Sequence, residues 1–214
     1  MRRIIHLVFS PASRLARLMI GEKRLACDYL LAEDASAHLP VFVDQDETRC
    51  EGLWAIVDHL EGEYENYPLF PEDTATRREA LRWLDLMMGV FPEIVTRRIV
   101  FEKANPRFTG APSRSTPDMN VIRKGREELH KALTAYGAIV EARGNLTSKA
   151  CTIADLALGA NLSALDYFGE VKWNDYPAMR EWYMRIKSRP AFRSLLADRV
   201  PGQPPVAHYA ELDF

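Results

Sequence analysis

Apolar residues follow two different periods in the two parts of this chain. Up to about residue 64, short runs of branched and aromatic residues alternate with helical patterns. They predict strands at 4–9, 27–31, 41–43 and 48–50, and helices at about 13–23 and 52–64. A polar turn at 44–47 separates the last two strands. The first part of the chain is therefore expected to form a small sheet with helices packed against it.

The first of these helices is expected to have one apolar side. Apolar residues recur in it near helical spacing, so the charged residues between them are expected to point to solvent. The apolar positions are Leu15, Leu18, Met19 and Leu25, and the charged positions are Arg14, Arg17, Glu22 and Lys23. Ser13 is expected to cap the helix, because a serine oxygen can accept a hydrogen bond from the first free backbone amides.

After a linker at 66–71 that contains two prolines, the apolar period becomes that of helices. It predicts a long helix from Thr74 to about Lys103, kinked at Pro92, and further helices at about 118–143, 177–187 and 191–197. A loop rich in proline, glycine and serine is expected at 105–116. The chain should thus divide into a first domain at 1–68, an all-helical domain at 72–200 and a C-terminal tail at 201–214.

One predicted helix in the second part of the chain begins with both a capping box and a hydrophobic staple. Thr152 suits the N-cap, and Asp155 lies three residues later, where its carboxylate can accept from the backbone of the cap. Cys151 and Leu156 stand at the two positions of a hydrophobic staple. The following residues, 153–162, are almost all small or apolar, which predicts a helix buried on every side.

Composition narrows the classes of function. The formal net charge is −2, which gives no reason to expect nucleic acid as a partner. The three cysteines, Cys27, Cys50 and Cys151, form no C-x-x-C pair, so neither a disulfide framework nor a metal site is expected. No apolar run approaches the roughly 20 residues of a membrane span. A cytoplasmic protein in a reducing compartment is expected.

Several short motifs resemble the glutathione transferase superfamily. They are Ser10-Pro11-Ala12-Ser13-Arg14, Leu39-Pro40-Val41, Glu51, and the box from Thr152 to Asp155. The resemblance implies an α+β glutathione-transferase fold, with an N-terminal thioredoxin-like domain of order β-α-β-β-β-α and an all-α C-terminal domain. It also implies a glutathione site. Ser10 or Ser13 would lie near the ligand sulfur, Leu39 and cis-Pro40 beside the cysteinyl unit, and Glu51 at the γ-glutamyl end. Ser13 has the simpler alternative of being a helix cap alone.

Two departures from that family pattern weaken the expected site. The family usually has a serine after the acidic residue, whereas this chain has Gly52, which offers no hydroxyl to a ligand carboxylate. The segment 32–38 is too short for the helix that the family places there, and it adds the acidic residues Glu33 and Asp34. We expect weak glutathione binding or none, no other cofactor, and a non-catalytic protein.

The tail resembles that of a more specific group. Residues 201–214, with 165–173 and 187–190, are similar to the FtsZ-localised protein A group, transferase-like proteins of alphaproteobacteria that bind filaments of the division protein FtsZ. This resemblance implies a homodimeric scaffold that binds FtsZ filaments at the division site and regulates bacterial cell division. The tail is expected to be ordered, docked on its own N-terminal domain or on the dimer partner. The expected partner-binding residues are Ser36, His38, His208, Tyr209, Leu212, Asp213 and Phe214.

Two other functions stay open at this stage. One is a glutathione S-transferase that conjugates glutathione to electrophiles through an unusual site. The other is a transferase-like regulator in a stress response or associated with a polymerase. Gly52 and the short segment 32–38 favour a binding protein over the enzyme.

Overall fold

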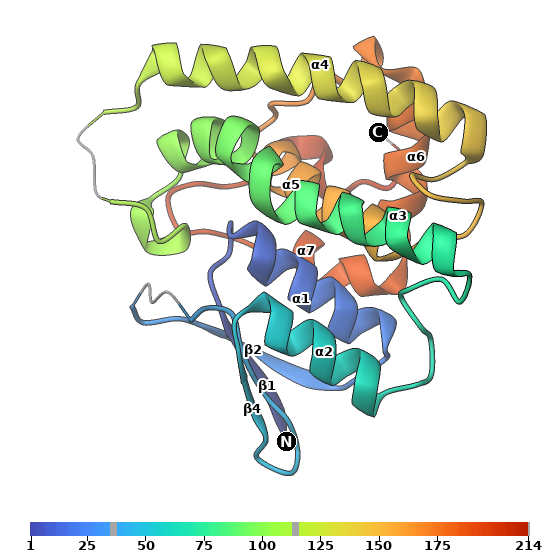
Figure 1. Ribbon diagram of the computed structural model, residues 1–214. Helices are drawn as coiled ribbons and strands as arrows, with labels where there is room; N and C mark the ends of the chain where they lie inside the picture. Colours follow the sequence, from blue (N-terminus) through green and yellow to red (C-terminus); the bar gives the residue numbers. More distant parts are fainter. Residues whose placement is uncertain (35–37, 113–115, 214) are drawn as a thin grey trace.

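The first part of the chain folds as a four-stranded sheet with two helices (Figure 1). The computed structural model describes residues 1–34, 38–112 and 116–213. In chain order the elements are β1 (Arg2–His6), α1 (Pro11–Glu22), β2 (Cys27–Leu31), β3 (Val41–Val43), β4 (Arg49–Glu51) and α2 (Leu53–Glu63). The strand order is β2-β1-β3-β4; β1 and β2 are parallel, and β3 is antiparallel to both β1 and β4. Helices α1 and α2 lie side by side on one face of the sheet.

The remainder of the described chain is helical. Its longer elements are α3 (Thr74–Asp85), the π-helical segments η1 (Leu86–Val90) and η2 (Pro92–Phe101), α4 (Met119–Arg143), α5 (Ile153–Tyr167) and α6 (Pro177–Lys187). Shorter turns are η3 (Pro106–Phe108), η4 (Trp173–Asp175), η5 (Pro190–Phe192), α7 (Arg193–Leu196) and η6 (Ala207–Ala210). All 15 residues of α5 are buried, as its composition predicts. Figure 1 shows α5 in the middle of this layer, with α1 directly below it.

Pro92 does not simply kink its helix. From Leu86 to Phe101 the chain is largely π-helical, with Pro92 at the first position of η2. Proline has no amide proton, so it cannot donate to the carbonyl four residues before it. In a π-helix each amide donates to the carbonyl five residues earlier, so the hydrogen-bond pattern around a proline differs from that of an α-helix. The helix therefore continues past the proline.

The predicted box at the start of α5 is formed, and it holds more than the cap. The Thr152 amide donates to one carboxylate oxygen of Asp155 at 2.9 Å. The other oxygen accepts from the Leu146 amide at 3.0 Å and from the Trp182 indole at 3.2 Å. Asp155 is fully buried, and burial raises the pKa of its carboxyl group although these hydrogen bonds oppose the rise. This one side chain joins α5, α6 and the end of the loop after α4.

The expectation for α1 is wrong in two respects. Ser10, rather than Ser13, is the N-cap, because the helix begins at Pro11 and the Ser10 oxygen accepts from the Ser13 amide. In addition, Arg14, Arg17 and Lys23 are buried instead of exposed. The physical reason is that α1 packs on both sides, against α2 on one and against α5 and η5 on the other. Apolar spacing reports a single buried face and misses a helix enclosed between two layers.

Candidate functional site

Three chain segments meet at one end of the sheet. The start of α1 follows β1, the Leu39–Pro40 bond precedes β3, and Glu51 and Gly52 lie between β4 and α2. The sheet order places β3 between β1 and β4, so these segments are neighbours. The Leu39–Pro40 peptide bond is cis, as predicted.

The two candidate serines have structural roles at the start of α1. Ser13 is fully buried, and its hydroxyl oxygen accepts a hydrogen bond from the Leu7 amide at 3.2 Å. A group so enclosed cannot contact a ligand thiol. Ser10 is half-buried and caps the helix through a long contact of 3.4 Å with the Ser13 amide. Beside it, the Phe9 amide donates to the Phe108 carbonyl at 2.9 Å, so the segment after η2 is seated on this turn.

At the expected γ-glutamyl end, the exposed Glu51 carboxylate is paired with neighbouring side chains, and Gly52 has no side chain. The Glu51 carboxylate accepts from Arg49 at 2.8 Å and lies 3.6 Å from the His38 ring, and the Arg49 hydrogen bond holds the pKa of that carboxyl below its usual value. Gly52 has φ +80°, a conformation that favours glycine. Its amide donates to the carbonyls of His38 and Pro40 at 2.8 and 2.9 Å. The position thus lacks a hydroxyl, and its amide is already bonded.

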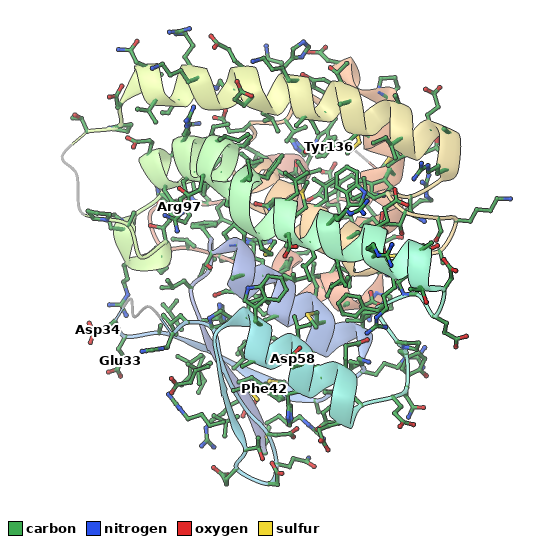
Figure 2. All side chains as sticks on the ribbon, in the orientation of Figure 1. Glu33, Asp34, Phe42, Asp58, Arg97 and Tyr136 are labelled. Atoms are coloured by element: carbon green, nitrogen blue, oxygen red, sulfur yellow. The ribbon has the colours of Figure 1, made fainter. Side chains whose placement is uncertain are left out.

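The segment between β2 and β3 carries acidic charge. Glu33 and Asp34 are exposed, and Figure 2 shows both side chains at the outer margin of the molecule. The described residues between the two strands, 32–34 and 38–40, contain no helix. Ser36, one of the predicted partner-binding residues, lies outside the described residues.

Burial shifts the pKa values of several potential nucleophiles and bases towards their neutral forms. Burial raises the pKa of the thiols of Cys27 and Cys151 to about 12, and it also raises that of Cys50. The buried His6 has a pKa lowered to about 4, by burial first and then by the charge of Arg17. In the parts of the chain that the structure describes, no group of acidic, histidine and cysteine side chains could hold a metal ion.

The tail returns across the helical layer and reaches the first domain at α1. Tyr209 is fully buried, and its phenol accepts from Arg14 at 3.1 Å and donates to the Leu195 carbonyl at 3.0 Å. Arg14 also donates to Ser163 of α5 at 2.8 Å and to Asp198 at 3.1 Å. One buried guanidinium thus joins α1, α5 and the tail of the same chain. Tyr209 is an anchor inside this chain, and its side chain is not available to a partner.

A second buried cluster holds the tail at His208. The His208 ring lies 3.1 Å from the carboxylate of Asp166, which is fully buried and also accepts from the Trp173 indole at 2.7 Å. The Lys187 ammonium donates to the His208 carbonyl at 3.1 Å. Beyond these contacts, Leu212 and Asp213 are exposed. Phe214 lies outside the described residues.

Comparisons with known proteins place the chain in a family. No known family profile matches it. A curated relative, the FtsZ-localized protein A of Caulobacter vibrioides, is 37% identical over the whole of this chain and 98% of its own length. The chain belongs to the FtsZ-localized protein A family.

Solved structures agree with this family and with the predicted fold. The structure of FzlA from C. crescentus has a TM-score of 0.91 and 36% identity, and covers 100% of this chain and 99% of its own. A glutathione S-transferase from Rhodospirillum rubrum F11 has a TM-score of 0.92 and 34% identity, with both chains fully covered. The α+β glutathione-transferase fold is therefore confirmed. No helix in the described chain is both long and apolar enough to cross a membrane.

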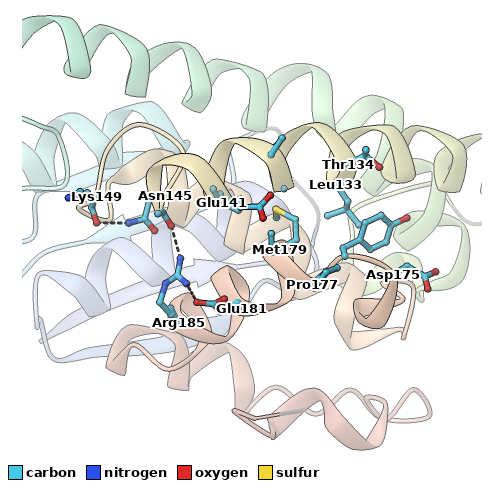
Figure 3. Close-up of a pocket in the computed structure, with 16 residues that line it drawn as sticks. Leu133, Thr134, Glu141, Asn145, Lys149, Asp175, Pro177, Met179, Glu181 and Arg185 are labelled. Carbon is cyan, nitrogen blue, oxygen red and sulfur yellow. Dashed lines mark hydrogen bonds and ion pairs between the residues drawn. The ribbon is translucent and has the colours of Figure 1, made fainter.

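A separate hollow of about 760 Å3 lies between α4 and α6, away from the expected glutathione site (Figure 3). Leu133, Gly137 and Met179 form part of its wall. At one end, Arg185 donates to the Gly144 carbonyl at 2.6 Å and to Glu181 at 3.1 Å. These bonds join the C-terminus of α4 to α6, so the charged groups at this end of the hollow have a structural role.

The sequence did not predict the buried cluster of Arg14, Arg17 and Asp198. Arg17 donates two hydrogen bonds to the Asp198 carboxylate, at 2.8 and 3.1 Å, next to the contact from Arg14. A weak signal was present, because Arg14 and Arg17 lie three positions apart and so share one helix face. Nothing local to either residue indicates that Asp198, about 180 positions later, closes over them.

Proposed function

We propose that this chain is a non-catalytic homodimeric scaffold that binds FtsZ filaments at the division site and thereby regulates cell division. The observation that carries the proposal is the full-length similarity, at 37% identity, to a protein named FtsZ-localized protein A. Membership of that family supports binding to FtsZ, and the geometry at Ser13 and Gly52 supports the absence of transferase chemistry.

The glutathione site of this scaffold is vestigial in our proposal. Glutathione carries a carboxylate at each end, and each end needs cationic or neutral donors. At one end Gly52 has its amide bonded internally and Glu51 repels a carboxylate. At the other end Glu33 and Asp34 add negative charge. Leu39 and cis-Pro40 keep the backbone shape of the site without its charge recognition.

The partner surface in this proposal consists of the exposed end of the tail and the segment after β2. Leu212 is 45% exposed, and His38 and Asp213 are exposed as well. Ser36 and Phe214, which the sequence also predicts to contact the partner, are part of this proposed surface. A two-fold dimer would present two such surfaces, so one scaffold could link two filaments or contact one filament twice.

Co-sedimentation with FtsZ polymer tests the binding. Wild-type protein is expected to pellet with polymer, and Leu212→Ser is expected to pellet less. Met119→Ser is the matched control, because Met119 is also apolar and exposed but lies at the start of α4. Removal of residues 206–214 is a poorer test than the sequence suggests, because it also removes the buried Tyr209. If wild-type protein stays in the supernatant with polymer present, the FtsZ proposal is wrong.

The alternative is a glutathione S-transferase that conjugates glutathione to electrophiles. The cis Leu39–Pro40 bond and the 34% identity to a solved structure named as a transferase favour it. Calorimetric titration with glutathione decides between the two. A dissociation constant in the low micromolar range, or conjugating turnover that Ser10→Ala abolishes, would establish the enzyme.

A further inference from the structure

Strand β2 forms one edge of the sheet and keeps large apolar side chains exposed along its length. Tyr29, Leu30 and Leu31 are 38%, 45% and 37% exposed. Proteins usually protect edge strands by charge or by shortness, because an open edge pairs readily with another chain. The opposite edge follows that rule, since β4 has three residues and exposes the charged Arg49 and Glu51. At β2 the charged Asp28 is followed by three exposed apolar side chains, so this edge is less protected than the edge at β4.

The backbone groups on the outer side of β2 follow from its pairing with β1. His6 stands opposite Leu31, and the Ala32 amide donates to the His6 carbonyl at 2.9 Å. Alternate residues of a strand direct their backbone groups to the same side, so residues 28, 30 and 32 face β1. The amides and carbonyls of Tyr29 and Leu31 therefore face outward. Within residues 1–34, 38–112 and 116–213, no other backbone group is bonded to them.

The two faces of this edge differ. The Tyr29 ring lies 5.2 Å from the Arg17 guanidinium of α1, so Tyr29 is on the face that the helices cover. Side chains alternate along a strand, which puts Leu30 on the opposite face. Figure 1 shows α1 and α2 together on the first face. An added strand could therefore contact apolar side chains on both sides.

The negative charge around the β2 edge favours some added strands over others. Asp28, Glu33 and Asp34 are exposed, and in the described chain no ion pair neutralises them. Figure 2 shows Glu33 and Asp34 projecting where the strand has ended. Pairing two copies of β2 would double these carboxylates on one edge, and like charges on paired strands are destabilising. The charge thus favours a basic partner over a second copy of this chain.

We propose that β2 accepts an extended partner segment of alternating apolar and basic residues as a fifth strand. Main-chain hydrogen bonds to Tyr29 and Leu31 supply affinity, and the surrounding carboxylates supply selectivity. The segment after β2 also belongs to the partner surface proposed above, so the peptide experiment is done without FtsZ and its result is read separately from co-sedimentation.

The probe is a synthetic peptide of alternating valine and lysine, labelled for fluorescence anisotropy. We expect the full chain to bind it with a dissociation constant below about 1 mM. A valine–glutamate peptide should bind at least about tenfold more weakly. Leu31→Pro should weaken binding of the lysine peptide by a similar factor, because proline removes an outward amide without breaking the pairing with β1.

Met119→Pro is the matched control, since Met119 is 62% exposed and stands at the first position of α4, where proline is tolerated. It should bind the peptide as wild type does. Circular dichroism verifies that both variants are folded, and loss of amide exchange at Tyr29 and Leu31 on binding locates the peptide. Absence of binding by wild type, or equal binding by Leu31→Pro, overturns the proposal. A change of oligomeric state in Leu31→Pro would show that a second copy occupies the edge instead.

Discussion

Single buried charges determine much of how this chain is joined together. Arg14, Asp155 and Asp166 are all fully enclosed, and each has a partner in another segment: Ser163, Trp182 and His208 respectively. Taking a charge out of water is costly unless it is fully hydrogen-bonded. Removal of one partner therefore lowers the free energy of unfolding by more than the contribution of a single hydrogen bond, because the other partner stays buried without it.

Asp155→Ala should be strongly destabilising. A cap alone contributes about 0.5–2 kcal/mol, but this change also leaves the buried Leu146 amide and Trp182 indole without an acceptor. We expect a loss of about 2–5 kcal/mol in the free energy of unfolding. Asp118→Ala is the control, because Asp118 caps α4 from an exposed position. Urea denaturation that ranks the two losses as equal would contradict this account.

Asp44 should make the fold sensitive to acid. Asp44 stands in the predicted polar turn at 44–47, yet it is buried, bonded to His59 at 2.7 Å and paired with Arg2 at 3.0 Å. Burial alone would raise the pKa of its carboxyl group, but the hydrogen bonds from Tyr64 and His59 outweigh burial and lower the pKa to about 2.

Because this pKa is lower in the folded state, the stabilisation is present above the unfolded value of 3.8 and is lost as the pH falls towards about 2. Urea midpoints measured between pH 5 and pH 2 should fall less steeply for Asp44→Asn than for wild type. Asp46→Asn, at an exposed neighbour, should change this slope less. An unchanged slope in Asp44→Asn would mean that the hydrogen bonds and ion pair of the Asp44 carboxylate do not stabilise the folded state.

At the scale of elements, close packing of α1 on the helical layer joins the two parts of the molecule. Gly21 makes this approach possible, since a Cβ atom there would lie 2.7 Å from the Ala191 Cα of η5. That distance is well inside van der Waals contact with backbone, which cannot move aside as a flexible side chain can.

Gly21→Ala should therefore destabilise the protein by about 1–3 kcal/mol, as overpacking does. Gly62→Ala provides the opposite case, because Gly62 is near the end of α2 and a Cβ atom there would have no neighbouring atom within 4 Å. Alanine should stabilise that helix by about 0.4–1 kcal/mol. Thermal unfolding of both variants checks the two signs. If both substitutions moved the midpoint in the same direction, packing at Ala191 would not be the cause.

At the scale of the whole molecule, the proposal of a vestigial glutathione site in a transferase fold can be tested at Gly52. Restoring the family residue by Gly52→Ser should fail to create binding. The φ of +80° at this position is unfavourable for serine, and the amide stays bonded to His38 and Pro40. Calorimetry should give a dissociation constant in the millimolar range or weaker for both wild type and variant. Micromolar binding by Gly52→Ser would show that the side chain alone was missing.

The amino-acid sequence was enough to predict the elements that depend on short-range patterns such as caps, turns and apolar periods. The strands at 27–31 and 41–43 and the helix at 177–187 have the predicted bounds, and α4 begins one residue after the predicted start. The cis bond before Pro40 and the box from Thr152 to Asp155 were also predicted, the first from family resemblance. These features depend on neighbours within a few positions, which is the range over which caps, turns and apolar periods act.

Which charges are buried and which candidate residues are accessible depends on contacts that form only in the folded chain. Arg14 and Arg17 have the local pattern of surface arginines, and Tyr209 that of an exposed tail anchor, yet they meet beside Asp198 in the interior. The helix cap is Ser10, three residues before the predicted Ser13, and the Ser13 hydroxyl instead accepts from the Leu7 amide. The reason is that burial of a polar group depends on partners that satisfy it, and those partners stand about 180 positions away in the sequence.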